Sequence, residues 1–243
     1  MPEMPFIWAH RGASAVAPEN TLAAFQAALA AGADGIELDV QVTRDGVPVV
    51  LHDERLDRTT DRRGRVRGLT LSQVRQADAG GWFHASFRGE RVPTLQEVFE
   101  WAGDTVELNL EIKDAAAAGA VLALLRFYPA ARVLVSSFDR SLLRRLRRAA
   151  PRLDLAVLCD RRFWRGALRE AVRLDARALN PRQDLFGAVM ASLCRQRRLR
   201  VYPWTVDDPA AMRRLLRQGA DGFFTNDPAA ARRLLSASDV AGD

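Results

Sequence analysis

The stretch AGADGIELDVQVTRDGVPVVLHD, residues 31–53, contains the pattern that decides the fold. Gly32 stands where a helix should end, because glycine readily takes the left-handed conformation that closes a helix. A strand is then expected over Gly35–Val42 and a returning strand over Val47–His52. The Asp45-Gly46 pair between these apolar runs is a strong signal for a two-residue hairpin loop. The pattern therefore predicts a strand that leaves a helix, followed by a second strand that turns back antiparallel to it.

The start of this stretch is echoed near the end of the chain. Residues 218–226 read QGADGFFTN, which resembles AGADGIELD at 31–39. Between the two echoes, short apolar runs alternate with helical patterns, as is typical of strand–helix units in a parallel sheet. Besides the returning hairpin strand, the expected strands are Phe6–His10, Gly35–Val42, Val106–Ile112, Arg132–Ser136, Leu155–Leu158, Ala176–Asn180, Val201–Val206 and Gly222–Thr225. The expected helices are Asn20–Ala31, Thr94–Ala102, Ala115–Phe127, Ser141–Ala149, Arg165–Val172, Leu185–Arg197, Pro209–Gln218 and Pro228–Ser236. This alternation predicts an α/β fold, a TIM (β/α)8 barrel.

The segment at about 53–92 interrupts the alternation. It is rich in Arg, Gly, Asp and Thr, and it is too long for a simple loop. We therefore expect a small insertion after the early β-hairpin, within a single barrel domain that spans residues 1–243. His84 lies in this segment between Phe83 and Ala85, and a surface or packing role is expected for it.

The composition excludes several classes of protein. Among 243 residues, 48% are hydrophobic and 27% are charged, which is typical of a globular chain. No apolar run approaches the ~20 residues that span a bilayer, so no stable membrane insertion is expected. The first residues show no secretory signal, and a cytoplasmic location is expected. Cys159 and Cys194 lie in apolar stretches without metal-ligand spacing, which predicts buried free thiols.

The positive charge of the chain comes almost entirely from arginine. Its 36 basic residues exceed the 30 acidic residues by six, and Lys113 is the one lysine among them. The arginines recur at helical spacing, as in LRRLRR at 143–148, which is typical of the solvated face of an amphipathic helix. No nucleic-acid-binding module is recognisable, so no nucleic-acid partner is expected.

Two expected strands carry ionisable residues that a covered parallel sheet should not contain. Side chains alternate along a strand, so Glu37 and Asp39 share one face. One face of the strand Val106–Ile112 and its extension holds Glu107, Asn109, Glu111 and Lys113. The apolar face should meet the helices, which directs the charged face into the barrel, near its C-terminal mouth. Glu107 or Asn109 alone would be typical of internal packing, but burying the whole set without a function would be costly.

These residue types together suit cleavage of a phosphate ester. With a two-residue hairpin loop, His52 would lie opposite Asp39 on the same face, and His10 ends the first strand. Two imidazoles can supply a general base and a general acid near neutral pH. Three clustered carboxylates repel one another unless a hard cation joins them, and an all-oxygen set suits Mg2+ or Ca2+. Arg11 and Lys113 add positive charge for an anion such as phosphate.

Short motifs occur in a fixed order along nearly the whole chain. They read HRGA at 10–13, PENT at 18–21, ELDV at 37–40, TRDG at 43–46, VVLHD at 49–53, PTL at 93–95, NLEIK at 109–113, SF at 137–138 and WTV at 204–206. This ordered set resembles the glycerophosphodiester phosphodiesterase family. The resemblance implies a TIM barrel with a small insertion and a phosphoric diester hydrolase activity. The chain departs from the family at Asp207, where Asn is frequent, and at Asn226, where Asp is commoner.

The resemblance also implies roles for single residues. The implied ligands of one divalent cation, Mg2+ or Ca2+, are Glu37, Asp39 and Glu111. The implied acid–base pair is His10 and His52. The implied phosphate and substrate contacts are Arg11 and Lys113, with Phe138 and Trp204 as apolar walls. Asn20 is implied to open the first helix and to support the His10 loop.

The reaction expected on this basis is metal-dependent hydrolysis of a glycerophosphodiester to sn-glycerol 3-phosphate and an alcohol, a step of glycerol and lipid metabolism. The sequence leaves open which histidine is the acid, and whether water or the glycerol 2-hydroxyl attacks phosphorus. It also leaves open the alcohol, the cation and the oligomeric state. One alternative is a lysophospholipase D-type phosphodiesterase, with an apolar mouth formed by Trp82, Phe83, Phe87 and Trp164. Another is an inactive barrel that acts as a binding protein.

Overall fold

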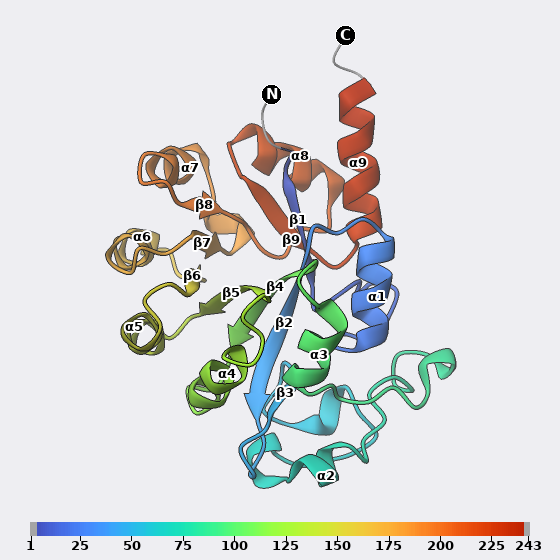
Figure 1. Cartoon of the computed structure of the whole chain (residues 1–243). Coiled ribbons are helices and arrows are strands. Elements are labelled where there is room, and N and C mark those ends of the chain that lie inside the picture. The colour runs from blue at the N-terminus through green and yellow to red at the C-terminus, as the bar shows by residue number, and fades with distance from the viewer. Residues whose placement is uncertain (1–3, 241–243) are drawn as a thin grey trace.

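Eight parallel strands form a nearly closed barrel with helices between them (Figure 1). The computed structural model describes residues 4–240. The strands follow the order β8-β7-β6-β5-β4-β2-β1-β9, and β3 pairs with β2 outside this path. The predicted TIM barrel with an additional hairpin strand is thus confirmed.

Most predicted elements are present, with ends shifted by a few residues. The strands are Phe6–His10 (β1), Gly35–Val42 (β2), Pro48–Val50 (β3), Glu107–Ile112 (β4), Arg132–Ser137 (β5), Asp154–Cys159 (β6), Ala178–Pro181 (β7), Arg200–Val201 (β8) and Gly222–Thr225 (β9). The helices are Leu22–Ala30 (α1), Leu71–Val74 (α2), Leu95–Ala102 (α3), Ala117–Leu125 (α4), Arg140–Ala149 (α5), Trp164–Arg173 (α6), Ala188–Arg195 (α7), Pro209–Arg217 (α8) and Pro228–Val240 (α9). Short 3-10 turns occupy Leu56–Arg58 (η1), Val66–Gly68 (η2), Ala85–Phe87 (η3) and Gln183–Leu185 (η4).

Side-chain caps decide where several helices begin. Thr21 accepts a hydrogen bond from a backbone N–H in the first turn of α1, and Asp139 and Asp208 do the same for α5 and α8. Such caps satisfy N–H groups that have no partner within the helix. The first helix therefore begins at Leu22, after the Thr21 cap, and not at Asn20 as expected.

The barrel closes through irregular backbone after β8. The predicted strand Val201–Val206 is regular only as far as Val201. Beyond it, Pro203 has no N–H group and cannot join a regular ladder. Backbone hydrogen bonds still tie this segment to β9, because Phe224 N–H donates to Pro203 O at 2.9 Å and Val206 N–H donates to Phe224 O at 2.8 Å. The last gap in the sheet is thus bridged without a continuous strand pair.

The hairpin after β2 has a longer loop than predicted. The N–H of Thr43 donates to the carbonyl of Val47 at 3.0 Å, so the loop holds three residues, Arg44–Gly46. Gly46 has a φ of 81°, which suits the left-handed last position of a three-residue loop. The Asp-Gly pair does mark the turn, but it does not form the whole loop.

The register expected for Asp39 and His52 is therefore wrong by one residue. Val40 pairs with Val50, and Leu51 N–H donates to the Asp39 carbonyl at 2.9 Å. Within a regular strand, such a slip would turn His52 to the opposite face from Asp39. However, β3 ends at Val50, and His52 lies in the bend that follows it.

Apolar side chains on the outer face of the strands form the main core with the helices. Ile36 and Leu38 on β2 and Leu108 and Leu110 on β4 are fully buried in this layer. Full burial of an aliphatic side chain contributes about 1.5–3 kcal/mol. Because side chains alternate, this packing directs the polar residues of the same strands into the barrel.

Aromatic side chains and ion pairs close the barrel interior toward the N-terminal ends of the strands. Trp8 stacks on Phe224 with ring centroids 5.8 Å apart. At the N-terminal ends of the strands, Glu107 lies 3.0 Å from Arg132 and 2.5 Å from Arg177. Glu107 is thus an internal salt-bridge residue, as its position alone would indicate.

The segment between β3 and α3 is the small insertion expected after the hairpin, and it lies beside the barrel (Figure 1). Leu56, Val66 and Val74 of this segment pack together with Val49 and Leu51 of the hairpin. This second apolar cluster anchors the insertion to the returning strand, next to the C-terminal end of β2.

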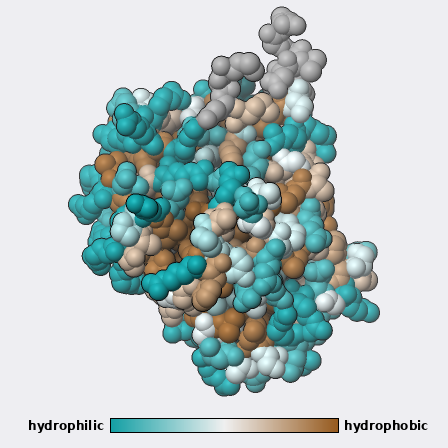
Figure 2. Space-filling view, in the orientation of Figure 1, coloured by the Kyte–Doolittle hydropathy of each residue, from teal (hydrophilic) through white to brown (hydrophobic). Residues whose placement is uncertain are grey.

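The face of the molecule seen in Figure 2 is mainly polar. Figure 2 shows hydrophilic residues over most of one face, with hydrophobic residues gathered in the hollows between elements. Among the helices of residues 4–240, none combines the length and apolarity that a bilayer crossing requires. Cys159 and Cys194 are buried and free, as predicted.

We predict that Gly46→Ala destabilises the protein by about 1 kcal/mol, because an L-residue is strained in the left-handed region. Apart from Gly46 and its two chain neighbours, no atom of the described residues lies within 4 Å of a Cβ added there, so the loss would arise from the backbone alone. Gly68→Ala is the control, since its added Cβ is equally free and its φ is not positive. Urea unfolding measures both, and equal stabilities of the two variants would contradict the proposed loop strain.

Candidate active site

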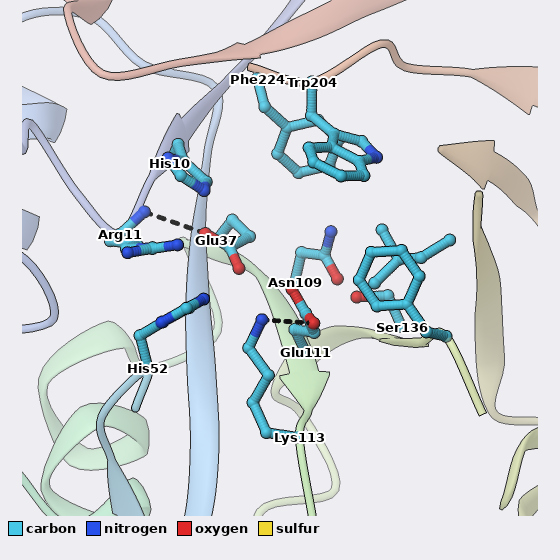
Figure 3. A pocket seen from close by; sticks show the side chains of 12 residues that line it. His10, Arg11, Glu37, His52, Asn109, Glu111, Lys113, Ser136, Trp204 and Phe224 are labelled. Atoms are coloured by element: carbon cyan, nitrogen blue, oxygen red, sulfur yellow. Dashed lines mark hydrogen bonds and ion pairs between the residues drawn. The ribbon is translucent and has the colours of Figure 1, made fainter. Parts of the chain in front are cut away.

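Three carboxylates, those of Glu37, Asp39 and Glu111, converge inside the C-terminal mouth of the barrel, and Figure 3 shows Glu37 and Glu111 among them. Glu37 and Asp39 come from β2 and Glu111 from β4, and Asp39 pairs with Glu111 across the two strands. One oxygen of each lies within 4.8 Å of the others. Glu37 and Asp39 are buried, and the Glu111 side chain is only 12% exposed. Oxygen ligands this close together suit a hard divalent cation.

Two basic side chains offset part of this negative charge. Lys113 Nζ lies 2.5 Å from a Glu111 oxygen and 3.1 Å from an Asp39 oxygen. Arg11 Nε lies 3.2 Å from the other Asp39 oxygen, and the backbone N–H of Arg11 donates to Glu37 at 2.9 Å. Lys113 reaches the cluster because it follows Glu111 by two residues and shares its face.

The three carboxyl groups have different pKa values in this environment. Burial favours the neutral form of Asp39, but Lys113 and Arg11 outweigh it and lower the pKa to about 2. Burial and then repulsion from Asp39 raise the pKa of Glu111 to about 7, although Lys113 opposes the rise. Burial and then Asp39 also raise the pKa of Glu37 well above its usual value. A divalent cation would compensate this crowding, so the three residues fit a cation site.

Asn226, just after β9, orients His10. Its Oδ1 lies 2.8 Å from His10 Nδ1, while its Nδ2 donates to Asp207 at 2.6 Å. Because the Asp207 carboxylate only accepts, the amide oxygen faces His10, and His10 Nδ1 carries the proton. Burial and then Arg11 lower the pKa of His10 to about 4, so the ring is neutral near pH 7. His10 Nε2 is therefore a free proton acceptor.

A carboxylate orients His52. Its Nδ1 lies 2.6 Å from Asp53, and Arg58 of the insertion donates to the same carboxylate at 2.8 Å. The hydrogen bond from Arg58 is the main reason why the pKa of Asp53 falls to about 2. His52 lies beyond the end of β3, so the alternation of side chains between the two faces of a strand does not fix its direction. It lines the cavity in spite of the shifted register.

Ion pairs join the insertion to the loop after β1. Arg58 donates to both oxygens of Glu19 at 2.8 Å, and Arg11 donates to Glu19 at 2.9 Å. Next to Glu19, Asn20 donates to Asp39 at 2.8 Å, and its backbone N–H donates to the Arg11 carbonyl at 3.0 Å. Asn20 thus supports the loop that follows His10, as expected, and it also holds an acidic residue of the cluster.

The predicted site residues surround one cavity of about 170 Å3. Those that line it are His10, Arg11, Glu37, His52, Glu111, Lys113, Phe138 and Trp204. Asp39 is in contact with Lys113 and Arg11 but does not line the cavity. The rings of Phe138 and Trp204 meet edge to face with centroids 5.7 Å apart and form an apolar wall. The structure thus brings the whole predicted set together.

Several residues that position this set were not predicted from the sequence. Asp53 and Glu19 lie within the motifs VVLHD and PENT, and this position in a motif was the one sign in the sequence of a role at the site. Asp207 and Asn226 were noted only as departures from the family pattern. Nothing in the sequence shows that they touch, because their contact depends on how the chain after β8 meets β9. Arg58 likewise reaches the site only through the folded insertion.

The aromatic residues expected at an apolar mouth lie elsewhere. Trp82, Phe83, Phe87 and Trp164 are absent from the lining of the cavity and from that of the two adjoining grooves. Phe83 instead packs edge to face against both Trp82 and Phe87 within the insertion. His84 is exposed and hydrogen-bonds to Ser86 at 2.9 Å, in agreement with the expected surface role.

The barrel and its cavity are those of a hydrolase that acts on phosphoric diesters. The chain belongs to the glycerophosphoryl diester phosphodiesterase family, whose model matches residues 10–230. A glycerophosphodiester phosphodiesterase of Caldanaerobacter subterraneus subsp. tengcongensis is 41% identical over 232 residues, which cover 90% of this chain and 92% of the relative.

Solved structures agree with this family membership. A phosphodiesterase of Oleispira antarctica, determined with the product sn-glycerol-3-phosphate, matches with a TM-score of 0.89 at 29% identity, covering 96% of this chain and 97% of the other. A glycerophosphodiester phosphodiesterase of Agrobacterium tumefaciens matches with a TM-score of 0.83 at 31% identity, covering 96% and 100%. The family and enzyme class expected from the sequence are confirmed.

We predict that Glu37→Gln stabilises the protein in the presence of a chelator, more strongly near pH 8 than near pH 5. A carboxyl group whose pKa is raised on folding contributes stability below its unfolded pKa of about 4.3 and loses it as the pH rises. A neutral isostere removes this pH-dependent cost. Urea unfolding near both pH values measures the difference.

Glu107→Gln is the matched control, because Glu107 is a buried glutamate on the same inner face that is paired with Arg132 and Arg177. Its neutralisation should cost about 1–3 kcal/mol, since it weakens both ion pairs. If both variants destabilised the protein equally, the charge crowding inferred at Glu37 would be wrong.

Proposed function

We propose that the protein hydrolyses glycerophosphodiesters to sn-glycerol 3-phosphate and an alcohol, in a metal-dependent reaction with histidine acid–base catalysis. The observation that carries the proposal is the convergence of three carboxylates, two basic side chains and two imidazoles on one cavity. The similarity to a structure that holds sn-glycerol-3-phosphate supports the choice of product.

Glu37, Asp39 and Glu111 would hold one divalent cation, Mg2+ or Ca2+. When bound, such a cation polarises phosphoryl oxygens and stabilises the negative charge that develops on them. Lys113 and Arg11 would bind the phosphate, because they place positive charge at the cavity beside the acidic cluster. Phe138 and Trp204 would pack against the carbon atoms of the substrate.

The different partners of the two histidines suggest a division of roles. His10 is neutral and offers Nε2 as an acceptor, so it would take the proton from the attacking hydroxyl or water. His52, held through Nδ1 by Asp53, would give a proton to the oxygen of the departing alcohol. Asn226 and Asp53 would act by keeping each ring in its productive orientation.

One assay panel tests the function. It comprises glycerophosphocholine, glycerophosphoethanolamine, glycerophosphoinositol and a lysophospholipid, each with Mg2+, Ca2+ or a chelator. We expect turnover of the glycerophosphodiesters with a divalent cation and loss of turnover with the chelator. Turnover of the lysophospholipid alone would favour a lysophospholipase D, and absence of all turnover would favour a binding protein.

We predict that His10→Ala and His52→Ala each lower kcat by about 10²–10⁴-fold, because each removes a general acid or base. His84→Ala is the control and should keep full activity, since His84 is exposed in the insertion and does not line the cavity. Steady-state kinetics on glycerophosphocholine measures kcat for each variant. Near wild-type kcat for either of the first two variants would remove that histidine from the mechanism.

We predict that Lys113→Arg lowers kcat by about tenfold or more. A planar guanidinium is bulkier than an ammonium, and the Lys113 Nζ is packed between Asp39 and Glu111. Arg132→Lys is the control for a change between the two basic residues, because Arg132 lies at the opposite end of the barrel and pairs with Glu107. Equal activities of the two variants would show that either basic side chain suffices at position 113.

A further inference from the structure

Two buried polar side chains in the cavity have no part in the mechanism described above. Asn109 is fully buried on β4, and Ser136, on the neighbouring strand β5, is 1% exposed. Both line the cavity. Within residues 4–240, neither the amide atoms of Asn109 nor the hydroxyl of Ser136 makes a hydrogen bond. Polar atoms buried this completely normally have partners, so their position in the wall of the cavity suggests that a ligand supplies them.

These two residues lie beside the acidic cluster. Asn109 pairs with Glu37 across β2 and β4, and Ser136 pairs with Glu111 across β4 and β5. Figure 3 shows the Asn109 amide and the Ser136 hydroxyl facing the same space as the Glu111 carboxylate. A substrate whose phosphate lies at Lys113 and the acidic cluster would therefore bring its first few carbon atoms next to them.

The chemistry of this part of the cavity suits a hydroxyl group. An amide both donates and accepts, and so does a serine hydroxyl. A neutral ligand hydroxyl, which also does both, matches them better than a second charged group would. The apolar walls are the side chains of Phe138, Leu158, Trp204 and Phe224, which can pack against the carbon-bound hydrogens of a small polyol.

The small volume of the cavity favours the glycerol arm of the phosphodiester over a larger alcohol arm. Its volume is about 170 Å3. This suits a glycerol arm with three carbons and two free hydroxyls. His52 and Lys113 also line an adjoining groove of about 780 Å3, whose other residues include Arg65 and Asp114. The two ester arms would thus occupy a smaller space and a larger one.

We propose that Asn109 and Ser136 form a hydroxyl-binding subsite that recognises the terminal hydroxyl of the glycerol arm, while the alcohol arm leaves through the larger adjoining groove. The inference rests on the proposed function and adds a specificity determinant to it. Recognition of the glycerol arm then depends on two neutral side chains that contact neither the phosphate nor the proton-transferring histidines.

The test compares glycerophosphocholine with 2-hydroxypropyl phosphocholine, which lacks only the terminal hydroxyl and keeps the 2-hydroxyl. We expect the wild type to prefer glycerophosphocholine in kcat/KM by at least about tenfold, because the analogue leaves buried polar groups unpaired. Asn109→Leu, which keeps the approximate volume, and the milder Ser136→Ala should each reduce this preference by at least about threefold. The effect should appear mainly on glycerophosphocholine, because the analogue has no terminal hydroxyl to lose.

Ser137→Ala is the matched control. Ser137 is the next residue on β5, is equally buried, and donates to the Ile112 carbonyl at 3.0 Å without lining the cavity. It should keep the wild-type preference. If Asn109→Leu proved too unstable to assay, Ser136→Ala alone would decide.

The outcomes separate this inference from the proposed function. A wild type that turns over both esters without preference, or variants that keep the full preference, would overturn the subsite and leave the proposed function standing. A wild type that turns over neither ester would overturn both. A preference that is lost in Ser136→Ala and kept in Ser137→Ala would support the subsite.

Discussion

The site depends on one electrostatic constraint, the crowding of Glu37, Asp39 and Glu111 inside the mouth of the barrel. Burial and mutual repulsion raise the pKa values of Glu37 and Glu111, whereas Asp39 stays ionised because Lys113 and Arg11 contact it. Much of the surrounding structure serves this arrangement. Strands β2 and β4 carry the acids as neighbours, and the loop after β1 brings in the compensating guanidinium. Three carboxyl groups face only two basic side chains, and a divalent cation would balance the remaining negative charge.

Segments far apart in the sequence hold the two imidazoles, and the partners differ in kind. A neutral amide after β9 accepts from His10, while a carboxylate tied to the insertion accepts from His52. The insertion therefore does more than cover the barrel, because Arg58 connects Asp53 to Glu19 and through it to Arg11. Orientation of both rings and of Arg11 thus depends on contacts between separate loops at the mouth.

Local patterns predicted much of this and failed where geometry beyond the strand mattered. The two-residue periodicity of ELD and NLEIK correctly directed Glu37, Asp39 and Glu111 inward, because the apolar face must meet the helices. The hairpin register was wrong by one residue, since an Asp-Gly pair fits loops of either two or three residues. His52 still reaches the cavity, for a different reason than expected, because it lies beyond the end of β3. The segment after Val201 was predicted to be a strand because a short apolar run has the same sequence pattern whether the backbone is regular or irregular.

The sequence by itself determined the barrel class, the inward face of each polar strand, the family and the set of side chains at the site, because strand periodicity, turn residues and ordered motifs are local properties of the chain. Only the tertiary structure decided the partners of these side chains: the amide of Asn226 for His10, Asp53 and Arg58 for His52, and Asn20 for Asp39. It also decided that Asn109 and Ser136 find no hydrogen-bond partner among the described residues at the cavity. These contacts depend on how the strands close the barrel and how the loops meet above it, and such long-range distances are not encoded in any short stretch of sequence.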